Sequence, residues 1–405
     1  MTENGVVIDD GTIRAPAIGP GDSQIMRLGF NRLSDNPGSD YHLNVRLKGR
    51  AAWSLLPAGH TYAHAQFELF NPNGGKRIVG PRKGRHIRID GEDGTITVLA
   101  DKTAFVFDRQ TGLLSQVRAN GQDLLLEPLT PDLWRAPTDN DFGNYMIDWA
   151  RIWQDSAEHR TLRSLKVVSE SGEKVTVRAV YDFGDGDGST AATWRSDFEM
   201  HASGDLKVVN RFTKTPGLPE LPRIGMNLVV NAAFDDVEWF GRGPFENYVD
   251  RRLAAEVGRY RNAVADHYVP YIRPQENGYK TDVRWFSLSD GASTGLLVQA
   301  DELVSFSAHN SLRSDFIPPV KIAITSEDGE GARENLERVN VHVNDIRPRD
   351  LVSVNIDLGQ MGVGGDDSWG KKTLRSYSLA DTAYEYSFWL KIYDGTRAGL
   401  DKLLK

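Results

Sequence analysis

The sequence predicts an all-β protein built from antiparallel sheets. Apolar and polar residues alternate in four long stretches, as in strands that bury one face: 41–47, 175–183, 352–358 and 384–392. Short runs rich in Gly, Asn and Asp separate such stretches and predict tight turns at 90–95, 119–122 and 184–189. Together these observations indicate a protein made mainly of antiparallel hairpins.

One segment departs from the strand pattern. Residues 144–164 place Met146, Trp149 and Trp153 at helical intervals, with charged residues on the opposite side. We therefore expect one short helix there, preceded by a polar turn.

Residues 74–86, with the sequence GGKRIVGPRKGRH, combine glycine, proline and basic residues in a way typical of linkers. We predict a small domain at 1–80 and a long domain at 81–405.

The overall composition excludes several classes of partner. The chain has 405 residues, 48 Lys and Arg against 56 Asp and Glu, and a formal charge of -8, so it offers no basic surface to nucleic acid. It has no cysteine, which excludes disulfides and thiolate metal sites. No apolar stretch reaches membrane-spanning length, so we expect no membrane partner and a cytoplasmic location, with the periplasm as the alternative.

Metal and phosphate motifs have little support. Residues 182–190, DFGDGDGST, resemble a calcium loop only in composition, because their oxygen ligands lack the EF-hand spacing, and a hairpin turn is favoured. The GVGGDD run at 362–367 lacks the Gly-Lys-Ser/Thr ending of a phosphate-binding loop. The nine histidines, with His42, His64 and His342 in extended sequence, include no metal-binding pair. We predict no metal site in this chain.

Two glutamates invite a catalytic interpretation, because a retaining glycosidase places two carboxylates about 5 Å apart. These are Glu246 and Glu276, each followed by asparagine. Basic residues flank both and are expected to keep them ionised: Arg242, Arg251 and Arg252 near Glu246, and Arg273 and Lys280 near Glu276. This environment favours structural ion pairs over general-acid catalysis. The adjacent Asp366 and Asp367 would point to opposite faces of an extended strand, so they make no catalytic pair.

Two aromatic segments are better candidates for sugar binding, because an indole can stack on the C–H face of a sugar. Residues 133–146, LWRAPTDNDFGNYM, join Trp134 to the polar turn Asp139, Asn140 and Asp141, although Trp134 and Trp149 are equally well explained as core residues. Residues 360–370, QMGVGGDDSWG, here called the Gly-rich segment, set Trp369 among glycines that permit sharp turns.

The sequence resembles the C-terminal region of the large bacterial β-galactosidases of glycoside hydrolase family 2. Five motifs carry the resemblance in order: LWRAPTDNDFG, LPRIGMNL, VEWFGRGPFENYVDRR, YVPYIRPQENGYKTDVRW and DLGQMGVGGDDSWG. It covers roughly residues 87–395, while the first 80 or so residues, with AWSLLPAGHTYAHAQFEL, resemble the later strands of an immunoglobulin-like domain.

The resemblance implies a fold and a division of labour. It implies a partial immunoglobulin-like β-sandwich followed by a large antiparallel supersandwich similar to galactose mutarotases. The catalytic glutamates and the magnesium and sodium ligands of the family would lie in domains outside this chain, so no cofactor is expected within it. The chain would be a C-terminal fragment or a small subunit, its partners the remaining domains or a large subunit, and the parent enzyme a homo-oligomer.

The resemblance also implies the site residues. Trp369, with Asp367 and Ser368 beside it, would contact the leaving glucose or an acceptor sugar while galactose is released by a retaining route. Asp139, Asn140, Asp141 and Gly143 would belong to a mobile loop near the active site, with Gly143 as its hinge.

Two other function classes stay open. A stand-alone mutarotase-like epimerase would need Glu246 or Glu276 to act together with His267. A non-catalytic small subunit or carbohydrate-binding module would bind sugar or a large chain without turnover.

Overall fold

The computed structural model describes residues 1–30, 36, 38–69, 79–91, 93–155, 159–184, 189–317, 340–367 and 370–404. The chain forms two compact units. The first comprises Met1–Ile78 and the short segment Glu256–Arg259, and the second comprises Val79–Ala255 and Tyr260–Lys405. The division at residue 78 falls inside the segment that the sequence predicts as a linker.

The first unit contains a small antiparallel sheet with the strand order β2-β1-β3-β4. Its strands are β1 (Thr2–Glu3), β2 (Val6–Val7), β3 (Tyr41–Lys48) and β4 (Thr61–Leu69). Across β3 and β4, Tyr41 faces Leu69 and Leu43 faces Phe67. The alternating apolar residues of 41–47 therefore share one face of the sheet, as expected for a strand.

Side chains of β3 and β4 hold the separate segment of this unit, since Arg46 and His64 both contact Glu256. The Nε2 of Gln66 donates to the carbonyl of Val257 at 2.8 Å, and its Oε1 accepts from the amide of Val257 at 2.7 Å. Gln66 thus makes the two hydrogen bonds with the backbone of Val257 that a neighbouring strand would make.

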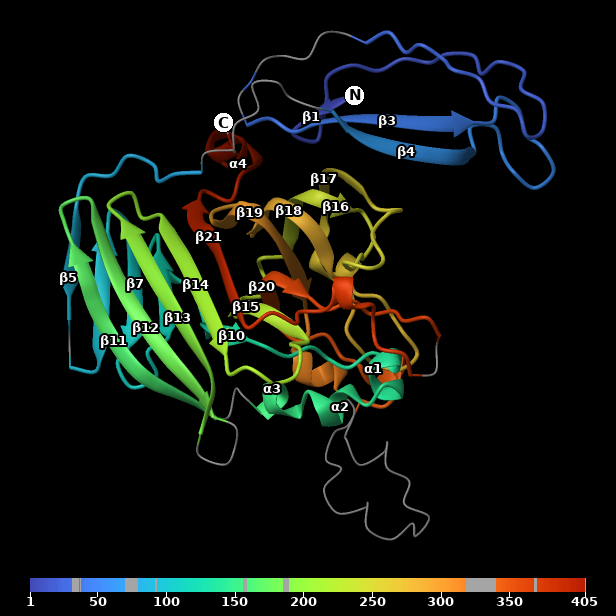
Figure 1. Cartoon of the computed structure of the whole chain (residues 1–405). Coiled ribbons are helices and arrows are strands. Elements are labelled where there is room, and N and C mark those ends of the chain that lie inside the picture. Colours follow the sequence, from blue (N-terminus) through green and yellow to red (C-terminus); the bar gives the residue numbers. More distant parts are fainter. Residues whose placement is uncertain are drawn as a thin grey trace, which may run out of the picture. The chain divides into compact units, whose positions relative to one another are not determined.

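The second unit holds most of the strands (Figure 1). They are β5 (Ile87–Asp90), β6 (Thr95–Ala100), β7 (Thr103–Asp108), β8 (Leu114–Ala119), β9 (Gln122–Asp123), β10 (Leu125–Asp132), β11 (Arg160–Glu170), β12 (Lys174–Gly184), β13 (Thr190–His201), β14 (Leu206–Lys214), β15 (Arg223–Val230), β16 (Asp236–Gly243), β18 (Lys280–Ser289), β19 (Gly295–His309), β20 (Val352–Gln360) and β21 (Ala383–Tyr393). The remaining strand, β17 (Glu256–Ala263), begins in the first unit and ends in the second.

These strands form a curled antiparallel sheet. Strands β11, β12, β13 and β14 pair in order, β14 pairs with β21, and β21 with β19. From β19 the pairing continues through β20 and β15 to β10, while β5 to β8 form a meander that meets β10. The predicted all-β class with antiparallel sheets is confirmed.

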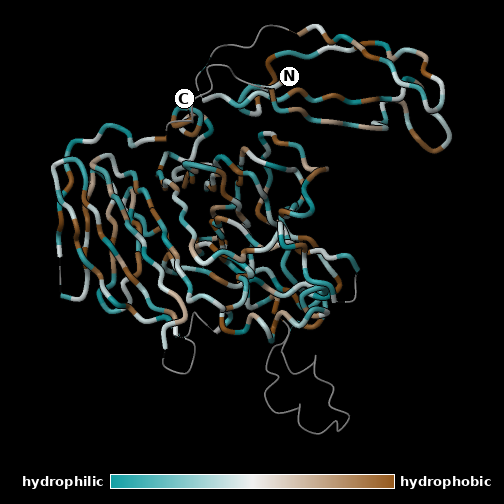
Figure 2. The backbone as a smooth tube through the Cα atoms, in the orientation of Figure 1, coloured by the Kyte–Doolittle hydropathy of each residue, from teal (hydrophilic) through white to brown (hydrophobic). Residues whose placement is uncertain are grey.

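The core lies between two layers of this sheet, with β5 and β7 on one side and β11 to β14 on the other in Figure 1. The ring of Phe107 on β7 meets the ring of Phe198 on β13 at 5.1 Å, edge to face. Along β12 every second residue from Val175 to Phe183 is buried, which matches the predicted alternation. Figure 2 shows the same mixture of hydrophobic and hydrophilic residues along these strands.

The helices are short, and they differ from the sequence prediction. The predicted turn is itself a helix, α1 (Asp139–Gly143), followed by α2 (Met146–Trp149) and α3 (Arg151–Asp155), while Arg160 already begins β11. Tyr145 interrupts the run because it adopts the left-handed conformation at φ 60°. The expected apolar face exists, since Met146 and Trp153 are fully buried.

The other helical elements are α4 (Arg397–Leu404) and the 3₁₀ turns η1 (Val264–His267), η2 (Arg313–Phe316), η4 (Val343–Asp345) and η5 (Arg375–Tyr377). Within the described ranges, none of the helices combines the length and apolar character that crossing a bilayer requires.

Candidate functional site

The first turn of α1 is fixed by its own sequence. The hydroxyl of Thr138 accepts a hydrogen bond from the amide of Asp141 at 3.2 Å, and the carboxylate of Asp141 accepts one from the amide of Thr138 at 2.9 Å. This reciprocal capping box satisfies amides that a helix start otherwise leaves without partners. Sequence reasoning took the Asp-Asn-Asp run as a turn because it did not recognise Thr138 as the N-cap.

A buried ion pair connects α1 to the Gly-rich segment. The guanidinium of Arg135 donates to both carboxylate oxygens of Asp141, at 3.0 and 2.8 Å, and both side chains are buried. The same guanidinium donates to the carbonyls of Met361 at 2.5 Å and Gly362 at 3.0 Å. One planar group therefore holds the helix start and the beginning of the Gly-rich segment together.

Two further contacts bring the same segments together. The Nδ2 of Asn140 donates to the carbonyl of Val363 at 2.9 Å. Near the other end of the segment, a Cβ added to Gly370 would lie only 2.6 Å from the carbonyl oxygen of Gly143. Glycine is therefore needed at Gly370 because the two backbones approach so closely.

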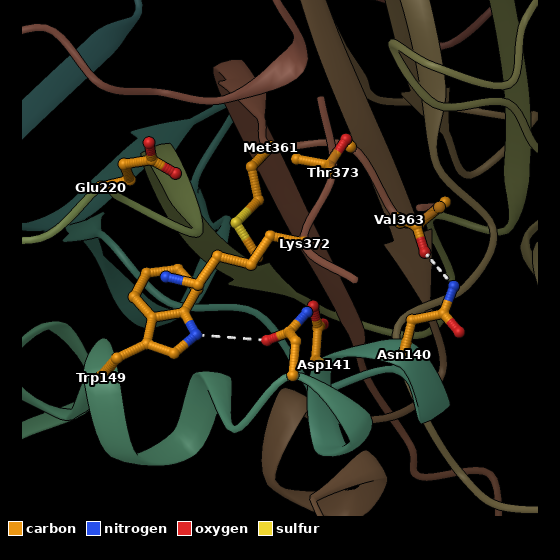
Figure 3. Close-up of a pocket in the computed structure, with 11 residues that line it drawn as sticks. Asn140, Asp141, Trp149, Glu220, Met361, Val363, Lys372 and Thr373 are labelled. Atoms are coloured by element: carbon orange, nitrogen blue, oxygen red, sulfur yellow. Dashed lines mark hydrogen bonds between the residues drawn. The ribbon is translucent and has the colours of Figure 1, made fainter. Parts of the chain in front are cut away.

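A small hollow lies beside α1 and α2 and is also lined by Glu220 and by residues 361–364 and 372–373 (Figure 3). Trp149 lines it, and its Nε1 donates to Asn144 at 3.2 Å. The ammonium of Lys372 stands 3.7 Å from the centre of the Trp149 ring, within the range of a cation–π contact. Trp149 is thus half-buried beside the Gly-rich segment, whereas Trp134 is a core residue.

Of the predicted site residues, Asn140 and Asp141 line this hollow. Trp369 and Ser368 lie outside the described residues. Asp367 is exposed and accepts hydrogen bonds from the amides of Gly370 at 3.1 Å and Lys371 at 3.3 Å. Asp139 is exposed on α1, where it pairs with Arg273 at 3.2 Å.

The two glutamates are held by ion pairs, as predicted, but through partly different residues. Glu246 accepts hydrogen bonds from Arg251, from the hydroxyl of Tyr271 and from the amide of Gly278. Glu276 pairs with the buried Arg223 at 3.1 Å rather than with a neighbour in sequence.

The other predicted basic partners are engaged elsewhere. Arg242 and Arg252 both bind Asp282. Arg273 binds Asp139, and the ammonium of Lys280 donates to the carbonyl of Gly278 at 2.9 Å. The prediction that these four residues pair with Glu246 and Glu276 is wrong, because folding brings charged partners together from distant parts of the sequence.

Arg223 is the centre of a buried charged cluster. It contacts Asp132 and Asp357, each at 3.1 Å, as well as Glu276. Burial raises the pKa of Asp357 to about 8, although the nearby Arg223 opposes this. Burial would also raise the pKa of Asp132, but Arg313 and Arg223 outweigh it and lower that pKa.

His267 has no access to a sugar. It is 1% exposed, its Nε2 lies 2.8 Å from Oδ1 of Asn262, and its ring packs edge-on against Trp239. Burial lowers the pKa of His267 well below its usual value. Among the described residues, no group of three potential ligands is arranged to hold a metal ion.

Comparison with known proteins identifies the family. The model of the beta galactosidase small chain matches residues 100–390, which is most of the sequence. The chain belongs to this family. The model of β-galactosidase domain 4 matches residues 1–70 of the same chain.

Relatives of this β-galactosidase small-chain region are parts of longer proteins. The β-galactosidase of Priestia megaterium is 31% identical over 86% of this chain and 31% of its own length. That of Vibrio cholerae is 32% identical over 88% of this chain and 32% of its own length. That of Pseudoalteromonas haloplanktis is 27% identical over 96% of this chain and 36% of its own length. The chain therefore spans about a third of the length of these relatives.

Solved structures with related geometry include galactose 1-epimerase from Lactobacillus acidophilus NCFM. It covers 77% of this chain and 100% of its own, with a TM-score of 0.42 and 10% identity. An aldose epimerase homologue from C. elegans covers 74% of this chain and 99% of its own, with a TM-score of 0.41 and 10% identity. Likeness at this level supports no inference about the site.

Sequence reasoning missed three residues of this β-galactosidase small-chain site. Arg135 lies three residues before the N-cap Thr138, and the sequence alone predicts no role for it. Lys372 and Asp250 gave no local signal, because Lys372 meets the ring of Trp149, and Asp250 the amide of Gly364, only in the folded chain.

Proposed function

We propose that this chain is the C-terminal part of a β-galactosidase and forms the aglycone side of its sugar site and part of the active-site cover. The parent enzyme would release terminal β-D-galactose from lactose-like substrates by a retaining route. The catalytic glutamates, with their magnesium and sodium ions, would belong to the remaining two thirds of the enzyme. Family membership and the coverage of about a third of each relative support this division of labour.

The observation that carries the proposal is the attachment of the Gly-rich segment to α1 and to Arg135, which precedes it. Arg135 and Asn140 bind the carbonyls of residues 361–363, and Gly370 packs on Gly143. These contacts hold the described residues on either side of Trp369, and we propose its indole as the platform for the leaving glucose or an acceptor sugar.

The described carboxylates favour a non-catalytic role for this chain. Glu246 and Glu276 are each held by an arginine partner, which favours a structural role for both. The epimerase alternative has less support still, because His267 is buried and bonded to Asn262.

The test is the Trp369→Ala variant of the complete β-galactosidase. We expect weaker binding of glucose as acceptor, by on the order of 1 to 3 kcal/mol, because an aromatic platform is lost. The measurement is the ratio of transfer to hydrolysis products with a nitrophenyl galactoside donor at increasing glucose. An unaltered glucose dependence would refute the aglycone role.

The purified chain provides a second arm of the test. We expect no hydrolysis of nitrophenyl galactoside by the chain alone, and robust turnover would refute the proposal. Co-purification with a separately expressed large chain would identify a small subunit, whereas a continuous reading frame in the parent gene would identify a fragment.

A further inference from the structure

The carboxylate of Asp250 contacts two residues, Gly364 and Thr373, that lie on either side of the end of the Gly-rich segment. The Oδ2 of Asp250 accepts a hydrogen bond from the amide of Gly364 at 2.8 Å, where the chain leaves the body of the unit. The same oxygen lies 3.5 Å from the hydroxyl of Thr373, where the chain returns. We call Gly364 and Thr373 the neck of the loop.

The packing around the neck leaves no space for a side chain at Gly362. A Cβ added to Gly362 would lie 2.5 Å from Oδ2 of Asp250 and 2.3 Å from the hydroxyl oxygen of Thr373. A Cβ added to Gly364 would lie 3.3 Å from the same Oδ2. The glycines at these positions therefore allow the backbone to come within hydrogen-bonding reach of the carboxylate.

Asp250 is itself carried by a rigid support. It stands in a tight turn whose flanking residues, Tyr248 and Arg251, exchange backbone hydrogen bonds at 3.3 and 2.8 Å. Tyr248 is buried and stacks on Tyr279 at 5.5 Å. Arg251 is held by Glu246, so this ion pair also supports the turn.

We propose that Asp250 is a positioning residue for the leaving-group side of the sugar site. By holding the neck, it fixes the point from which the loop extends and so determines how well a hexose acceptor is held. Glu246 and Arg251 contribute indirectly, because their ion pair supports the turn that contains Asp250. This inference rests on the proposed function of the loop and assigns a specific role to a side chain that touches no substrate.

The experiment uses the complete β-galactosidase with the Asp250→Ala and Asp250→Asn variants. Alanine removes the acceptor for both neck groups, so we expect the half-saturating glucose concentration for transfer to rise about tenfold, as for loss of one charge-assisted hydrogen bond. The rate of hydrolysis without glucose should fall by a smaller factor. Asparagine keeps one oxygen acceptor and should restore the glucose dependence to within about twofold of the wild type.

Two further variants separate positioning from general damage. Gly362→Ala forces Asp250 and Thr373 apart from the other side and should also raise the half-saturating glucose concentration. Asp290→Ala is the matched control, because Asp290 accepts hydrogen bonds from the amides of Ala292, Ser293 and Thr294 within its own turn. Loss of these bonds should leave the glucose dependence as in the wild type.

The outcomes distinguish the inference from the proposed function. If Trp369→Ala weakens acceptor use and Asp250→Ala does not, the role of Asp250 is refuted and the function stands. If Asp250→Ala lowers hydrolysis and transfer by the same factor, Asp250 is only structural and the inference is refuted. If neither variant alters acceptor use, the proposed function fails and the inference fails with it.

Discussion

The substitution Asp357→Asn should remove a pH dependence from the stability of the second unit. Asp357 is fully buried on β20, where its Oδ2 accepts from the hydroxyl of Tyr279 at 3.0 Å and lies 3.1 Å from Nε of Arg223. Its Oδ1 has no hydrogen-bond partner among the described residues. Asparagine can place its oxygen at the Oδ2 position and so imitates the protonated acid.

The sign and size of the effect follow from the raised pKa of Asp357, about 8 against 3.8 for an unperturbed group. A carboxyl with a raised folded pKa binds its proton more tightly when folded, so its contribution to stability is complete below pH 3.8 and is lost as the pH rises toward 8. Each pKa unit corresponds to about 1.4 kcal/mol, so the group should lower the free energy of unfolding by roughly 4 kcal/mol between pH 5 and 8.

Urea unfolding followed by tryptophan fluorescence at pH 5, 6, 7 and 8 measures this effect. The difference between wild type and variant isolates Asp357 from neighbours such as His309, whose pKa is lowered by burial to about 4. Asp290→Asn is the control, because the hydrogen bonds in its turn outweigh burial, keep its pKa low and confine its effect to acid pH. Equal slopes of stability against pH in wild type and Asp357→Asn would refute the reasoning.

Two further substitutions probe the attachment of the Gly-rich segment. Asp141→Asn leaves the buried Arg135 without its counter-charge and should cost about 3 kcal/mol of unfolding free energy, measured by urea unfolding; a loss below about 1 kcal/mol would contradict a structural role for this pair. Lys372→Ala uncovers one face of Trp149 and should cost less than about 1 kcal/mol while increasing acrylamide quenching of fluorescence. The added quenching should be absent when Trp149 is replaced by phenylalanine, and its persistence there would contradict the assignment.

Much of the fold could be predicted from alternation alone. The patterns at 352–358 and 384–392 lie within β20 and β21, although residues 352–357 and 388–393 are buried on both faces and not on one. Helix α1 was missed because its five residues contain no apolar repeat, and only the Thr138 cap marks its start. Helix length was overestimated because the predicted helix at 144–164 is divided at Ala150 into α2 and α3, and β11 already begins at Arg160.

Less of the candidate site could be predicted. The basic residues near Glu246 and Glu276 in the sequence predict that both glutamates form ion pairs. Arg223, however, lies 53 positions before Glu276, and the two meet only in the folded chain. Asp250 and Gly364 are 114 positions apart and meet for the same kind of reason. The assignment of Trp369 came from family resemblance and stays a prediction.

The bond between Gln66 and Val257 has a consequence for the order of events during synthesis. The two residues are 191 positions apart, yet they belong to the same compact unit. A ribosome must therefore translate more than half of the chain before the amino-terminal unit can receive its last segment. That unit is begun first but is completed only after many strands of the second unit have already emerged.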